Sequence, residues 1–84
     1  MTTFGVHYNS LMSKEEFQKA IGKRIKYLRT GQNMSQAELA ALCNFEKSNM
    51  NRIESGKTNP SSYTLYRISV SLGVKLSDIT NVIK

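Results

Sequence analysis

The sequence predicts an all-α protein, a compact bundle of five short helices that follows a short N-terminal arm. Apolar residues recur at spacings of three and four along most of the chain, the periodicity of helices that bury one face. Serine-led capping patterns precede these stretches, and glycine or asparagine follows them. Because 84 residues correspond to one domain, we expect the arm at 1–12 and a single helical domain at 13–84.

The arm carries a weak alternation, in which Phe4, Val6 and Tyr8 are separated by Gly5 and His7. Such a segment could be a short strand, a coil packed on the domain, or part of a dimer contact, and the sequence leaves these three open. His7 is the sole histidine of the chain, and we expect no chemical role for it.

The first predicted helix opens the domain. Residues 13–16, Ser-Lys-Glu-Glu, form a capping box, and we expect the helix to run to about Thr30 and to end at Gly31. Glycine weakens a helix by about 1 kcal/mol relative to alanine, so we expect Gly22 to mark close packing or a slight bend. The apolar face of this helix consists of Phe17, Ile21, Ile25 and Leu28.

Residues 35–56 predict two further helices joined by a tight turn. A second capping box at 35–38 starts the first of them, Asn44 suits a left-handed turn, and Gly56 ends the second. Two helices with so short a connection cross at a steep angle. The apolar positions that we expect to face inward are Leu39, Leu42 and Cys43 in the first helix and Phe45, Met50 and Ile53 in the second.

The outer face of the second of these helices is entirely polar and consists of Lys47, Ser48, Asn51 and Arg52. These side chains carry the groups that read base edges in DNA, since arginine and lysine pair with guanine, asparagine pairs with adenine, and serine pairs with either. The pattern therefore favours a surface that recognises bases.

Two more helices complete the predicted bundle. Residues 57–60, Lys-Thr-Asn-Pro, have the composition of a loop. Ser61 then caps a helix that runs to about Leu72 and stops at Gly73, and a last short helix covers about 76–83. The expected core positions of the longer helix are Leu65, Ile68 and Leu72; Tyr66 and Val70 are left open, and Tyr63 and Tyr66 could instead lie at an interface.

Composition narrows the classes of function. The net charge is +6, from twelve lysines and arginines against six acidic residues, which favours an anionic partner such as nucleic acid. A single cysteine excludes an internal disulfide and a cysteine-rich metal site, and together with the lack of a signal peptide it indicates a cytoplasmic protein. The sequence has no membrane-spanning run, paired carboxylates or glycine-rich phosphate loop, so we expect neither enzyme activity nor a cofactor.

Taken together, the motifs resemble the lambda-repressor-like, Xre-type helix-turn-helix family of DNA-binding domains over roughly residues 21–79. The chain departs from the family pattern at Asn44, where glycine is usual, and at Glu46, where serine or threonine usually caps the second motif helix. The matching pieces are Ile-Gly-Lys-Arg-Ile-Lys-Tyr-Leu-Arg at 21–29, Met-Ser-Gln-Ala-Glu-Leu-Ala at 34–40, Asn-Arg-Ile-Glu-Ser-Gly-Lys at 51–57, Asn-Pro-Ser at 59–61, Thr64-Leu65 and Leu-Gly-Val at 72–74.

The resemblance implies a transcription regulator that binds a palindromic operator in double-stranded DNA as a homodimer, through the major groove. It implies a structural ion pair between Arg29 and Glu54, which would fix the second motif helix against the first helix of the domain. The implied base contacts come from Lys47, Ser48, Asn51 and Arg52, and the implied phosphate contacts come from Gln36, Lys57, Thr58 and Asn59.

Three other functions stay open at this point. The chain could be the antitoxin of a toxin–antitoxin pair, with the arm binding a protein toxin. It could be the controller protein of a restriction–modification system, which the sequence does not separate from other regulators. It could also be a protein-interaction module that has lost DNA binding, but the polar face at 47–52 argues against that reading.

Overall fold

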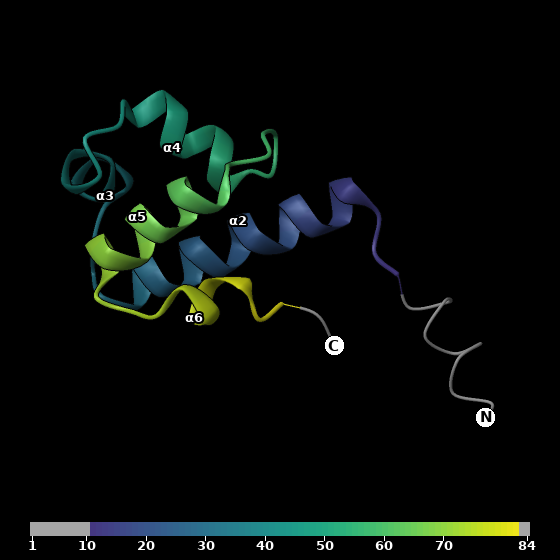
Figure 1. Ribbon diagram of the computed structural model, residues 1–84. Helices are drawn as coiled ribbons and strands as arrows, with labels where there is room; N and C mark the ends of the chain where they lie inside the picture. Colours follow the sequence, from purple (N-terminus) through teal and green to yellow (C-terminus); the bar gives the residue numbers. More distant parts are fainter. Residues whose placement is uncertain (1–10, 83–84) are drawn as a thin grey trace.

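The computed structural model describes residues 11–82, and within this range it contains five helices and no strand (Figure 1). The predicted all-α bundle of five helices is therefore confirmed. The alternation expected at residues 4–8 lies outside the described residues. The helices are α2 (Lys14–Gly31), α3 (Gln36–Leu42), α4 (Lys47–Glu54), α5 (Ser62–Leu72) and α6 (Leu76–Thr80).

The bundle has the long helix α2 near its middle. Helix α4 packs on one side of α2 and on α3, whereas α6 packs on another side of α2 and on α5 (Figure 1). Helix α5 also contacts α3. The pair α3 and α4 therefore packs on two other helices, α4 on α2 and α3 on α5. This arrangement leaves the outer face of α4 open to solvent.

Serine side chains start three of the helices, as the sequence predicted. Both capping boxes are formed: the Ser13 hydroxyl accepts from the Glu16 amide at 3.0 Å and the Ser35 hydroxyl accepts from the Glu38 amide at 3.0 Å. Ser61 caps α5 in the same way, by accepting from the Thr64 amide at 3.1 Å. Each such cap contributes about 1 kcal/mol to helix stability.

Asparagines form two of the turns. Asn44 has φ 57°, which confirms the left-handed turn predicted between the two motif helices. The first helix ends at Gly31, as predicted, and the left-handed residue that follows it is Asn33, with φ 56°. Asparagine adopts the left-handed conformation at low cost because its short polar side chain can form hydrogen bonds locally. Neither of these two turns therefore requires a glycine at its left-handed position.

Each helix contributes a fully buried residue to the core. These are Ile25 from α2, Leu39 from α3, Met50 from α4, Ile68 from α5 and Ile79 from α6. The core is thus a single cluster to which every described helix contributes, and it fixes the positions of α3 and α4 relative to α2.

One predicted core position is wrong. Leu42 is 60 % exposed, whereas Leu39, Ala40 and Cys43 are buried. At about 100° per residue, positions 39, 40 and 43 share one flank of the helix, and Leu42 falls on the other side of Leu39 from Ala40. The buried position on this side of the helix is taken by the small residue Ala40. The prediction chose Leu42 because it is larger and more apolar, and so it assigned the wrong flank of the helix to the core.

Three further details of the sequence prediction need correction or completion. Phe45 lies in the turn before α4, partly buried against the core, and not within the helix. Tyr66 and Val70, which the sequence left open, are exposed, so the core of α5 consists of the three predicted positions together with the small residue Ser69. Helix α6 ends at Thr80, earlier than the predicted 83.

Gly22 lets α4 approach α2 closely. A Cβ atom at this position would lie 2.4 Å from the carbonyl oxygen of Glu54 and 2.5 Å from that of Ile53. Both atoms belong to the backbone of α4, so they cannot move out of the way as a flexible side chain would. The close packing expected at Gly22 is confirmed, and it sets the distance between α2 and the end of α4.

Candidate nucleic-acid interface

The outer face of α4 is a polar surface with its own shallow hollow. Met50, Ile53 and Glu54 of this helix are buried, so the residues between them point outward. The hollow is lined by four residues of α4 and one of α3: Lys47, Ser48, Asn51, Arg52 and Gln36. The structure therefore brings the four residues predicted to contact bases together in one place, next to a residue predicted to contact phosphate.

A buried ion pair joins the inner side of α4 to α2. The Arg29 guanidinium donates from Nε to Glu54 Oε2 at 2.7 Å and from Nη2 to Oε1 at 2.9 Å. Its remaining nitrogen, Nη1, donates to the Met34 carbonyl at 2.8 Å, in the connection between α2 and α3. The hydrogen bonds to Glu54 raise the pKa of Arg29 above its ordinary value, although burial opposes this shift. The guanidinium thus joins α2, α4 and the α2–α3 connection.

Gln36 has two partners inside the protein, which the sequence did not indicate. Its Nε2 donates to Glu54 Oε1 at 3.0 Å, and its Oε1 accepts from Asn51 Nδ2 at 3.3 Å. One hydrogen of Nε2 is left over for a phosphate contact. The signal that could have revealed these bonds is the position of Gln36 in the first turn of α3, a helix that packs on α4.

The loop after α4 begins where that helix meets the start of α2. Gly56 has φ 76°, and Gln18 of α2 donates to its carbonyl at 3.3 Å. The next residue, Lys57, donates its amide to the Arg52 carbonyl at 3.0 Å, which closes the helix end. The side chains of Lys57 and Asn59 are exposed and that of Thr58 is partly buried. These three residues adjoin α4 in the chain but do not line its hollow.

The charges on this face are mostly positive. Lys47 and Arg52 lie on α4 and Lys57 follows it, while the carboxylate of Glu54 is neutralised by Arg29. Glu46, the N-cap residue of α4, is exposed and its side chain makes no capping hydrogen bond. It places one negative charge at the helix start, where the helix dipole favours it. The face can attract a polyanion and present donors and acceptors to it.

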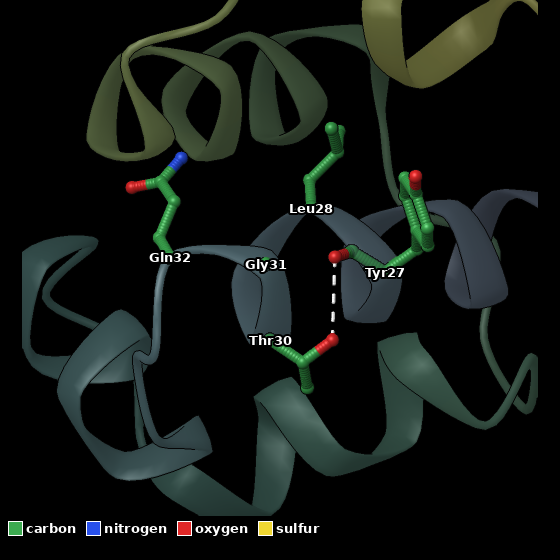
Figure 2. A pocket seen from close by; sticks show the side chains of 5 residues that line it. All are labelled: Tyr27, Leu28, Thr30, Gly31 and Gln32. Carbon is green, nitrogen blue, oxygen red and sulfur yellow. Dashed lines mark hydrogen bonds between the residues drawn. The ribbon is translucent and has the colours of Figure 1, made fainter.

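A second hollow lies at the end of α2 and is lined by Tyr27, Leu28, Thr30, Gly31 and Gln32 (Figure 2). The side chains of Thr30 and Gln32 form hydrogen bonds within the protein. The Thr30 hydroxyl donates back to the Tyr27 carbonyl at 3.2 Å, the bond drawn in Figure 2, and Gln32 donates to the Leu72 carbonyl of α5 at 2.7 Å. The bond from Gln32 joins the end of α2 to α5, so this side chain has a structural role.

Two other features were sought in the described residues, a metal site and a membrane-spanning helix. Across residues 11–82 no group of three or more histidine, cysteine, aspartate or glutamate side chains could hold a metal ion. Over the same part of the chain, no helix is both long enough and apolar enough to cross a membrane.

Comparison with known proteins agrees with this geometry. The family model HTH_3, described as helix-turn-helix, matches residues 25–79. The chain is 36 % identical over 59 residues to the immunity repressor protein of Bacillus phage phi105, a match that covers 70 % of this chain and 41 % of the repressor. It is 30 % identical over 59 residues to the HTH-type transcriptional regulator y4dJ of Sinorhizobium fredii, covering 70 % of this chain and 77 % of that protein.

A solved structure shows the same arrangement of helices. The restriction–modification controller protein C.AhdI from Aeromonas hydrophila superposes with a TM-score of 0.72 and 26 % identity, over 74 % of this chain and 94 % of the controller. The chain therefore spans less than half of the phage repressor but nearly the whole of this small regulator. From the matched family model and these relatives, the chain belongs to the HTH_3 family of helix-turn-helix transcriptional regulators, which are DNA-binding proteins and not enzymes.

Proposed function

We propose that this protein is a cytoplasmic transcription regulator that binds a palindromic operator in duplex DNA as a homodimer, with α4 in the major groove. The single observation that carries the proposal is the solvent-open face of α4, on which cationic, hydroxyl and amide side chains surround one hollow. An α-helix fits the major groove, where these groups can distinguish base pairs.

Each predicted site residue has a place in this proposal. Lys47, Ser48, Asn51 and Arg52 point out from α4 and contact base edges. Helix α3 lies across the backbone, and its N-terminus together with Gln36 binds a phosphate. The loop that follows α4 holds the adjoining backbone through Lys57, Thr58 and Asn59. The pair Arg29 and Glu54 is structural, since both side chains are buried beneath the interface.

The proposed two-fold symmetry of the dimer can be tested from the symmetry of the DNA sequence that it binds. A homodimer would present two copies of α4 about 34 Å apart, one turn of DNA, and would select a palindrome with half-sites at that spacing. Selection of bound duplexes from a random pool should therefore return an inverted repeat. A consensus with a single half-site, together with a monomeric mass by light scattering at binding concentrations, would refute the dimer.

A restriction–modification controller is the second candidate, because the chain covers 94 % of one such controller at a TM-score of 0.72. This candidate uses the same interface and differs only in the genes regulated. A selected consensus that occurs upstream of adjacent methyltransferase and endonuclease genes would favour it. A protein toxin as partner has no support in the described residues, and co-purification of a second small protein is the observation that would favour it.

A further inference from the structure

A chain of hydrogen bonds connects the buried ion pair to the exposed face of α4. Arg29 donates to Glu54 at 2.9 Å, Gln36 donates to the same carboxylate oxygen at 3.0 Å, and Asn51 donates to Gln36 at 3.3 Å. It begins at side chains that are less than one tenth exposed and ends at an exposed amide. A residue predicted to contact a base is thus linked to the core through one intermediate side chain.

The direction of every bond in this chain is fixed by chemistry. A carboxylate held by an arginine only accepts hydrogen bonds, so the group that Gln36 turns toward Glu54 must be its NH₂. The carbonyl oxygen of Gln36 then faces Asn51, and an oxygen of this kind only accepts. Asn51 must therefore turn its own NH₂ toward Gln36. Reversing either amide would place two acceptor oxygens in contact and remove the hydrogen bond between the two groups.

This orientation determines what Asn51 can offer to a base. One hydrogen of its Nδ2 is used by Gln36, which leaves one N–H donor and the Oδ1 acceptor for a base. Adenine presents an acceptor at N7 and a donor at N6 in the major groove, and this pair complements the donor and acceptor of the asparagine amide. Guanine presents two acceptors, N7 and O6, and would place its O6 against the Asn51 oxygen.

We infer that Gln36 is a positioning residue that orients the Asn51 amide, and that the protein thereby selects adenine over guanine at one position of its operator. The inference rests on the proposed function, since it assumes that α4 enters the major groove. Gln36 acts on specificity through Asn51 and needs no contact with a base. Glu54 is the fixed point that sets the direction of both amides.

The test is a double-mutant cycle read at every position of the selected operator. Affinities of the wild type, Gln36→Ala, Asn51→Ala and the double variant are measured for the consensus duplex and for all its single-base-pair variants. Alanine is the best helix former, and Glu54 keeps both of its bonds to Arg29, so Gln36→Ala should fold. Gln36→Met, which keeps the length of the side chain, serves as a second variant. Asn49→Ala, an exposed asparagine of α4 outside the hollow, is the matched control.

The expected result is confined to one base pair in each half-site. Asn51→Ala should lower the preference for adenine over guanine there by about 5- to 150-fold, the range for one base contact. Gln36→Ala should lower the same preference by about 2- to 12-fold, the range for one hydrogen bond. It should have no further effect on that preference in the Asn51→Ala background, and Asn49→Ala should leave the preference unchanged.

Two other results would overturn the inference and are distinguishable. If the wild type selects a consensus but Gln36→Ala weakens all duplexes equally, in both backgrounds, Gln36 binds a phosphate only and the positioning role is wrong while the proposed function stands. If the wild type shows no preference for any duplex over random DNA, the proposed function fails and the inference fails with it. Cooperative thermal unfolding of each variant shows that folding is not the cause.

Discussion

Replacing Gly22 by alanine should destabilise the protein, although alanine is the better helix former. The new Cβ would lie 2.4 and 2.5 Å from two carbonyl oxygens of α4 and 2.8 Å from a carbonyl carbon. Real Cβ atoms essentially never lie so close to other heavy atoms, so α4 has to move away from α2. Overpacking of this kind costs about 1–3 kcal/mol, from which the gain in helix propensity, about 1 kcal/mol, is subtracted.

Gly31→Ala is the matched control, because Gly31 lies in the same helix and a Cβ atom added there would meet no heavy atom of a neighbouring element within 4 Å. This variant should be stabilised by up to about 1 kcal/mol. The assay is urea unfolding followed by circular dichroism, in which the two midpoints should move in opposite directions from that of the wild type. Equal stabilisation of both variants would refute the reasoning, since it would mean that α4 does not lie against Gly22.

Four further predictions test the core pair, the interface and a cap. Arg29→Ala leaves a buried carboxylate unpaired and should cost about 3–5 kcal/mol in unfolding free energy, and a loss below about 1 kcal/mol would contradict the buried pair. Arg52→Ala should cost about 1–3 kcal/mol in binding and relax the preference at one base pair, so equal losses on consensus and scrambled duplexes would remove Arg52 from the base contacts. Lys57→Ala should weaken all duplexes alike and reduce the slope of log affinity against log salt by about one, and an unchanged slope would exclude a phosphate contact. Hydrogen bonds from the backbone amide and the hydroxyl of Ser35 lower the pKa of Glu38, so Glu38 stabilises the fold above its unfolded pKa and this contribution is lost as pH falls through the folded pKa. Glu38→Gln removes the titrating group and should make unfolding less sensitive to acid, and an unchanged pH profile of the urea midpoint would argue against this contribution.

The sequence was sufficient for features that depend on local chemistry. The capping boxes at Ser13 and Ser35 and the left-handed turn at Asn44 each involve residues within a few positions of one another, so their patterns are visible in the chain. The polar face of α4 was also predictable, because a helix with Met50 and Ile53 inside must turn the intervening residues outward.

Features that depend on packing between helices were harder to predict. Leu42 was placed in the core because it is large and apolar, yet the neighbouring helices contact the flank that carries Ala40. The bonds of Gln36 with Glu54 and Asn51 depend on which side chains meet where α3 packs on α4, and the short connection between the two helices does not specify those partners.

Arg67 ties the pair α3 and α4 to the rest of the molecule. The Arg67 side chain extends from α5, and its guanidinium donates to the Cys43 carbonyl and lies 5.0 Å from the centre of the Phe45 ring. These two contacts hold the turn between the two motif helices against α5. A synthetic peptide of residues 35–56 would lack the contacts from Arg67 and the ion pair with Arg29. Its two helices, of seven and eight residues, are too short to be stable alone in water. Grafting the motif onto another protein would therefore require transplanting α2 and α5 as well.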